Sequence, residues 1–148
     1  MGLYFEEFSV GQKITTEKRT ITENDIMTFA ALSGDDNRIH TDPEFSKTMP
    51  FGRQVAHGIL GLAIASGLAW QTGILDGTVI AFREINEWKF AVPVFISDVL
   101  QAEMEVAETK ALPRIGGGAV TINFKLKNQK DEVCHRGIWN VLVMSKPK

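Results

Sequence analysis

Gly58 to Leu75 is an uncharged stretch that constrains the fold of this chain more than any other segment. It reaches the lower limit of about 18 residues for a helix that spans a membrane. Gln71, Thr72 and several glycines interrupt it, however, and no second such segment or basic flank accompanies it. Because each glycine costs a helix on the order of 1 kcal/mol relative to alanine, only close packing on many sides could hold it. We therefore expect a helix that is buried inside the protein and not in a membrane.

The residues after this stretch show the alternation of apolar and polar side chains that is typical of β-strands. It is clearest over 100–106 and 120–127, and strands are also expected over 79–90 and 132–144, with a Gly- and Pro-rich loop over 112–118. A further strand is expected over 13–21, ahead of the helices. The order predicts an α+β protein in which an antiparallel meander sheet is wrapped around one buried helix. At 148 residues the chain fits a single domain, 1–148.

Composition and charge exclude several classes of protein. A formal net charge of -2 gives no reason to expect nucleic acid or an anionic membrane as a partner. The one cysteine, Cys134, cannot form an internal disulfide, and it is expected to be a small buried hydrophobe. We expect a cytoplasmic protein on that ground. The N-terminus has early acidic residues and no apolar segment, so a signal peptide is not expected.

Asp35, Asn37 and His40 lie together on the stretch Ser33-Gly34-Asp35-Asp36-Asn37-Arg38-Ile39-His40. Thr22 and Asp25 form a capping box that starts a helix, and Gly34 is the expected end of that helix. The three polar residues therefore fall on the turn that follows. A carboxylate and an imidazole that converge there could share the activation of one water. The alternative is an ordinary turn, in which Asp and Asn bond to the local backbone.

A metal site is a second alternative for the same stretch. Asp35, Asp36, Asn37 and Asp42 supply oxygen atoms, and His40 adds a nitrogen. The calcium-loop pattern fails because Ile39 stands where an oxygen ligand is required. No zinc-binding spacing of His and Cys is present either. We therefore expect no metal.

His57 and Gly58 begin the long uncharged stretch. A glycine at the start of a buried helix offers a free backbone N–H at the positive end of the helix dipole. A carbonyl oxygen could approach it closely, as in an oxyanion hole for a thioester or ester. Ser66 falls about two helical turns further along the same face, where it could hydrogen-bond to Asp35 or to its own helix. Gly58 could also serve dense packing alone.

The segment 33–40 resembles the hydratase motif of the MaoC-like dehydratases, the (R)-specific enoyl-CoA hydratases. Ala56-His57-Gly58 with Ser66 resembles the second block of that family, and Phe90, Pro93 and Asp98 resemble a third, weaker block. The resemblance covers nearly the whole chain. It implies a hot-dog fold, an antiparallel sheet around a long central helix, and usually a homodimer or a dimer of dimers.

The resemblance also implies the roles of the site residues. Asp35 and His40 would hold the catalytic water, while the Gly58 N–H, next to His57, would polarise the thioester carbonyl. Ser66 would support Asp35, and Asn37 would shape the turn. Two positions depart from the family pattern: Arg38 replaces the usual Pro, and Ser97 replaces the usual Gly before Asp98.

The expected reaction is the hydration of a trans-2-enoyl thioester to the (R)-3-hydroxyacyl thioester, or the reverse dehydration. The expected substrate is an acyl-CoA or acyl-carrier-protein thioester, and no cofactor is expected. An acyl-CoA thioesterase is the alternative enzyme. A non-catalytic acyl-thioester-binding subunit of a hydratase complex is the alternative from another class of protein.

Overall fold

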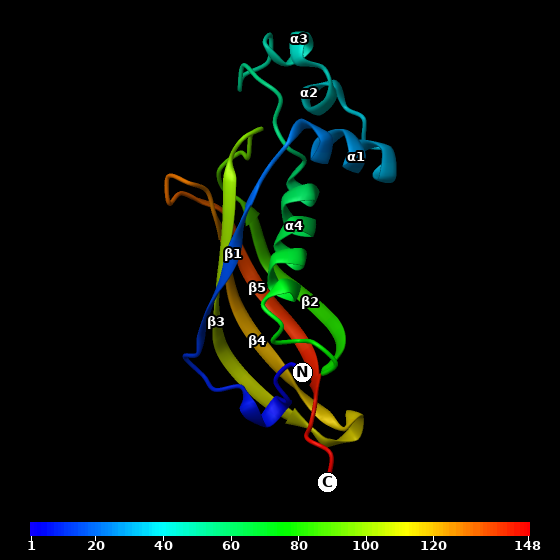
Figure 1. Cartoon of the computed structure of the whole chain (residues 1–148), viewed down its shortest axis with the longest axis vertical. Helices are drawn as coiled ribbons and strands as arrows, with labels where there is room; N and C mark the ends of the chain where they lie inside the picture. The colour runs from blue at the N-terminus through cyan, green and yellow to red at the C-terminus, as the bar shows by residue number, and fades with distance from the viewer.

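The computed structural model describes all residues, 1–148, and is built from five strands and four α-helices. The strands are β1 (Lys13–Thr20), β2 (Val79–Phe90), β3 (Val99–Leu112), β4 (Gly117–Lys127) and β5 (Val133–Met144). The α-helices are α1 (Glu23–Ser33), α2 (Arg38–Thr41), α3 (Pro43–Ser46) and α4 (Gly58–Gln71). Short 3-10 helices lie at Phe5–Glu7 and Pro113–Ile115. The predicted order of a strand, then helices, then a run of strands is confirmed (Figure 1).

The strands form one antiparallel sheet in the order β1-β3-β4-β5-β2. Only β3, β4 and β5 make a meander, because β2 pairs with β5 and not with β3. The prediction of a simple meander is therefore wrong for β2. The predicted loop over 112–118 is also shorter than expected. The register of β3 against β4 continues to Leu112 opposite Gly117, which leaves only the 3-10 turn between them.

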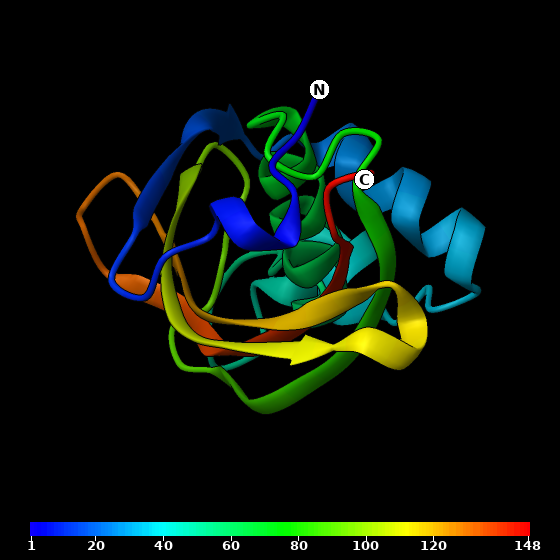
Figure 2. The same cartoon turned by 90° about the horizontal axis from the view of Figure 1, so that it is seen from below.

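The sheet curls around α4, as Figure 2 shows. One face of α4 packs Leu60, Ile64 and Leu68 into a core with buried sheet residues such as Met104 and Ile122. The helix ends at Gln71, earlier than predicted, because the Thr72 hydroxyl donates to the Ala69 carbonyl and Gly73 takes a left-handed φ of 81°. This arrangement confirms the predicted α+β hot-dog fold.

Two further expectations concern burial. No helix is long and apolar enough to cross a bilayer, α4 included. The side chain of Cys134 is fully buried among apolar neighbours, and burial raises the pKa of its thiol to about 11. A thiol of that pKa stays protonated and unreactive, in line with the structural role expected for it.

Residues 34–57, which we call the overhang, connect α1 to α4 and project beyond the end of the sheet (Figure 1). The Asp42 carboxylate caps α3 by accepting from the backbone N–H of Glu44 and Phe45. The buried Ser46 hydroxyl donates to the carbonyls of Asp42 and Ile39. Polar bonds to the backbone therefore shape this segment, which carries the motif residues of the sequence analysis.

Strand β2 is one edge of the sheet and carries exposed apolar side chains. Val79, Ile80, Phe82 and Ile85 are each about two-fifths exposed (38%, 42%, 45% and 40%). An unpaired edge of this kind can pair with a strand from another chain.

Candidate active site

The turn after α1 is fixed by the residues that sequence analysis singled out. The capping box of Thr22 and Asp25 starts α1, and Gly34 ends it in the left-handed conformation, with φ 80°, as predicted. The Asp35 carboxylate accepts a hydrogen bond from the Asn37 N–H at 3.3 Å. The Asn37 side chain in turn caps α2 by accepting from the Ile39 N–H at 3.1 Å. Asn37 thus shapes the turn that carries Asp35, the role that the resemblance implies.

His40 lies on α2, and its ring orientation is set by a backbone carbonyl. Nδ1 lies 2.6 Å from the Val55 carbonyl oxygen. Since a carbonyl can only accept, Nδ1 carries the proton and Nε2 keeps a free lone pair. Burial, aided by the neighbouring His57, lowers the pKa of His40 below its usual 6.5, although the Val55 carbonyl and Asp35 act in the opposite direction. His40 is therefore neutral at neutral pH and can accept a proton at Nε2.

The side chain of His57 packs inside the site and is only 3% exposed. Its Nε2 donates to the Asp35 carbonyl oxygen at 2.8 Å. Its ring stacks on His40 with centroids 3.9 Å apart and meets the Phe29 ring edge-on at 4.8 Å. His57 therefore ties the start of α4 to the backbone of Asp35. Sequence reasoning placed His57 beside the oxyanion donor but gave no signal for the direction of its ring.

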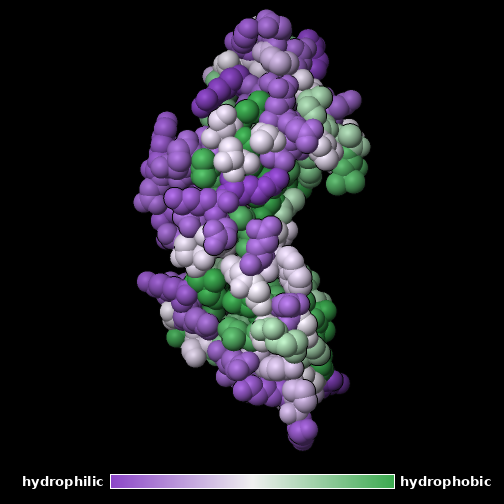
Figure 3. Space-filling model, viewed as in Figure 1, coloured by the Kyte–Doolittle hydropathy of each residue, from purple (hydrophilic) through white to green (hydrophobic).

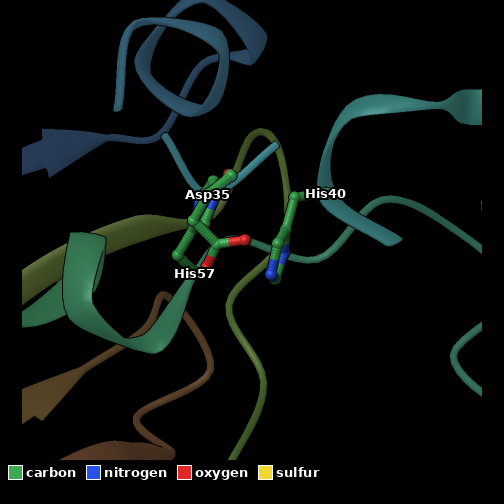
Figure 4. A group of neighbouring side chains, drawn as sticks. All are labelled: Asp35, His40 and His57. Carbon is green, nitrogen blue, oxygen red and sulfur yellow. The ribbon is translucent and has the colours of Figure 1, made fainter. Parts of the chain in front are cut away.

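Asp35 on the turn after α1, His40 on α2 and His57 just before α4 converge, as Figure 4 shows. One ligand atom from each lies within 4.8 Å of those of the other two. Because a hydrogen bond to water is about 2.8 Å long, a single water can bridge two groups at this separation. The set is also one that could hold a metal ion, since two imidazoles and a carboxylate are familiar zinc ligands. The expectation of no metal at this site stays a prediction.

Gly58 is the first residue of α4, and its backbone N–H has no acceptor in the protein. The glycine also serves close packing, the alternative that the sequence left open. A Cβ at this position would lie 2.7 Å from Cδ1 of Phe90, so the Phe90 ring fills the space beside the Gly58 Cα. Sequence analysis matched Phe90 to a weak motif block but did not place it at the site. Glycine at 58 therefore lets Phe90 pack against the helix end, while the N–H remains free for a ligand.

Ser66 does not hydrogen-bond to Asp35. Its hydroxyl donates to the Ala63 carbonyl at 2.6 Å, inside its own helix, which is the alternative that the sequence left open. A helix interior satisfies a serine hydroxyl locally when no outside acceptor is within reach. Ser66 instead lines an apolar groove between α4 and β2, with a cavity volume of about 260 Å³, together with Ile59, Leu62, Ala63, Phe82, Ile85 and Trp139.

The two departures from the family pattern have different structural consequences. Arg38 is the first residue of α2, a position that suits proline, and its guanidinium lies 3.9 Å from the centre of the Phe45 ring. Asn37 still caps the helix, so the turn is intact. Ser97 has a φ of 76°, in the left-handed region that glycine adopts without strain. Arg38 is thus tolerated, whereas Ser97 carries a backbone cost.

Comparison with known proteins agrees with this fold. Residues 6–127 match the family described as MaoC like domain. The 3-hydroxybutyryl-CoA dehydratase of Methylorubrum extorquens is 35% identical over 72% of this chain, and the matched region spans 65% of that protein, just under two thirds of its length.

Two solved structures match over almost the whole chain. A protein described as a monoamine oxidase regulatory protein from Archaeoglobus fulgius has a TM-score of 0.91 and 39% identity, covering 99% of this chain and 97% of that one. R-hydratase PhaJ1 from Pseudomonas aeruginosa has a TM-score of 0.81 and 30% identity, covering 98% of this chain and 88% of that one. On the family match and these similarities, this chain belongs to the MaoC-like dehydratase family.

Proposed function

We propose that this protein is a hydro-lyase that adds water to trans-2-enoyl thioesters or removes it from (R)-3-hydroxyacyl thioesters. The observation that carries the proposal is the convergence of the Asp35 carboxylate and a neutral His40 at the start of α4. That helix begins with a free Gly58 N–H. The names of two relatives, a 3-hydroxybutyryl-CoA dehydratase and an R-hydratase, support the same reaction.

In the hydration direction, the thioester carbonyl oxygen accepts a hydrogen bond from the Gly58 N–H. Asp35 and His40 hold one water between them, and His40 Nε2 takes a proton from it as its oxygen attacks C3. The electron pair of the C2–C3 double bond moves to form an enolate, whose negative charge gathers at the Gly58 N–H and the positive end of α4. The proton then passes to C2 from the same face, which gives syn addition. No metal or redox cofactor takes part in these steps.

His57 has a positioning role in this mechanism. It fixes the Asp35 backbone through Nε2 and stacks on the His40 ring, so it holds Asp35 and the base His40 at a constant separation. Asn37 also has a positioning role, because its N–H donates to the Asp35 carboxylate and its side chain caps the helix that carries His40. The apolar groove that begins at Ile59, next to Gly58, would take the acyl chain.

The protein is proposed to act as a homodimer. The edge of β2 is unpaired and carries exposed apolar side chains, and the groove along α4 opens beside it. Pairing of β2 with β2 of a second copy would continue the sheet across the dimer and cover the groove. Light scattering of the purified protein measures the molecular mass directly, and a monomer at micromolar concentration would contradict this assembly.

The reaction is tested with crotonyl-CoA and the purified wild-type protein. A hydratase removes the enoyl-thioester absorbance without releasing a thiol, and chiral analysis of the product should give the (R)-3-hydroxyacyl thioester. Release of free CoA would identify the alternative thioesterase. No reaction with crotonyl-CoA or with longer and carboxylated enoyl thioesters would favour the non-catalytic binding subunit.

A further inference from the structure

A small hollow lies between the overhang and Ile96 and shares no residue with the acyl groove. It has a volume of about 170 Å³ and is lined by Pro43, Lys47, Gly52, Arg53, Gln54 and Ile96. The Gln54 side chain, which is buried, donates to the His40 carbonyl at 2.8 Å. One residue that lines the hollow is therefore hydrogen-bonded directly to the backbone of His40, the proposed base. Figure 3 shows that the surface at this end of the molecule is mostly hydrophilic.

Arg53 is the strongest feature of this hollow. Its guanidinium lies 3.7 Å from the centre of the Phe95 ring. No carboxylate lies within ion-pairing distance of it, although the overhang contains four acidic residues, Asp35, Asp36, Asp42 and Glu44. Stacking holds the guanidinium plane in place while its N–H edge stays free, a geometry that suits bidentate binding of a phosphate.

Lys47 supplies a second cation on the same rim. It pairs with Glu44 at 2.9 Å, but the two side chains are 64% and 82% exposed. An ion pair that is so exposed contributes little stabilising free energy. Lys47 can therefore leave Glu44 and turn toward an incoming anion at a small cost in free energy. Phe51 adds an exposed aromatic ring, which meets Phe95 edge-on at 6.0 Å. Two cations beside an exposed flat ring match the phosphates and the base of a nucleotide.

We propose that this hollow binds the phosphate groups at the far end of the pantetheine arm, with Arg53 as the main contact. This inference rests on the proposed function, because the thioester must lie at Gly58. Arg53 and Gly58 are close in sequence, so their Cα atoms are at most about 18 Å apart. The inference therefore places an extended pantetheine arm between the helix end and the hollow. The exposed Phe51 favours the nucleotide of coenzyme A over the bare phosphate of a carrier-protein arm.

The test compares three crotonyl thioesters that differ only in the arm: crotonyl-CoA, crotonyl-4′-phosphopantetheine and crotonyl-pantetheine. Loss of a charge-assisted hydrogen bond costs enough to weaken binding by roughly tenfold or more. Arg53→Gln should therefore raise the KM for crotonyl-CoA by about tenfold and leave kcat unchanged. The KM for crotonyl-pantetheine, which has no phosphate, should not change. Arg114→Gln is the matched control, because Arg114 is an exposed arginine at the opposite end of the molecule.

The phosphorylated arm separates the two sources of phosphate. A KM increase confined to crotonyl-CoA assigns the contact to the nucleotide phosphates. An equal increase with crotonyl-4′-phosphopantetheine assigns it to the phosphate that both carriers share. Either result supports the inference. An equal increase for crotonyl-pantetheine, or no increase with any of the three substrates, would overturn it.

Direct binding keeps this inference separate from the proposed reaction. If the wild type turns over none of these thioesters and no longer or carboxylated enoyl thioester either, the proposed function fails, but CoA binding can still be measured by calorimetry. Arg53→Gln should then raise the Kd for CoA about tenfold relative to the wild type and to Arg114→Gln. Equal Kd values in the three proteins would overturn the assignment of the hollow.

Discussion

The overhang is stabilised by different forces from the rest of the protein, the sheet with α4, which we call the body. Of the 22 residues in the buried hydrophobic cluster, only Ala56 comes from the overhang. The overhang is fixed instead by bonds from side chains to the backbone, such as those of Asn37, Ser46 and Gln54. The body is fixed by apolar burial against α4. The proposed catalytic side chains, Asp35 and His40, therefore lie in a segment that contributes little to the core, so activity and stability should be separable by mutation.

The largest stability effect should come from the body, at Leu68. It is 2% exposed on α4, and Leu68→Ala should lower the free energy of unfolding by about 2–5 kcal/mol through lost burial and a cavity. Urea denaturation measures this loss, with Leu32→Ala as control because Leu32 is 83% exposed. The kcat of the folded Leu68→Ala protein should stay within a few-fold of wild type. A large drop in kcat would show that activity depends on the packing of the body as well as on the overhang.

His135 should make the stability of the body depend on pH. Burial lowers the pKa of His135 from 6.5 to about 4 in the folded protein. Below pH 6.5 the unfolded chain takes up a proton that the folded protein excludes until about pH 4. Stability is therefore fully present above 6.5 and is lost as pH falls through this window, by up to about 3 kcal/mol.

Thermal unfolding of the wild type and His135→Leu over that range checks the effect. The variant should lose less stability on acidification than the wild type does. Parallel curves for the two proteins would show that His135 does not titrate in this way.

Gly61 tests how tightly the body packs beneath the site. A Cβ there would clash with Cε1 of the buried His135 ring, so Gly61→Ala should cost about 1–3 kcal/mol through overpacking. Gly67, in the same helix, has open space around it. Gly67→Ala should therefore stabilise by up to about 1 kcal/mol. Chemical denaturation of both variants compares them, and equal changes would show that His135 does not confine Gly61.

The smallest effect concerns the strained Ser97, in the loop between β2 and β3. Its φ of 76° should cost about 1 kcal/mol relative to glycine, partly offset by the greater freedom of glycine in the unfolded chain. Ser97→Gly should therefore raise the unfolding midpoint slightly and leave kcat unchanged. A lower midpoint would mean that the serine side chain contributes more than the backbone strain costs.

Local sequence signals predicted the parts of the fold that depend on neighbours along the chain. Thr22 and Gly34 bound α1 as expected, and the turn with Asp35 follows it, but His40 lies on α2 and not on that turn as predicted. Contacts between segments that are distant in the sequence could not be predicted from such local signals. The partner of His40 is the carbonyl of Val55, and the place beside Gly58 is filled by Phe90. The position of β2 next to β5 is a property of the whole sheet, which strand patterns alone do not contain.

In the proposed mechanism, Asp35 and His40 activate one water, and both lie in a segment that contributes little to the core. Crotonyl-CoA hydration and thermal unfolding, measured side by side for the wild type and Asp35→Asn, test this directly. The kcat of Asp35→Asn should fall by roughly 10²–10⁴-fold, while its unfolding midpoint stays within a degree or two of wild type. Wild-type activity in Asp35→Asn would contradict the mechanism. A loss of activity matched by a comparable loss of stability would contradict the separation of the overhang from the body.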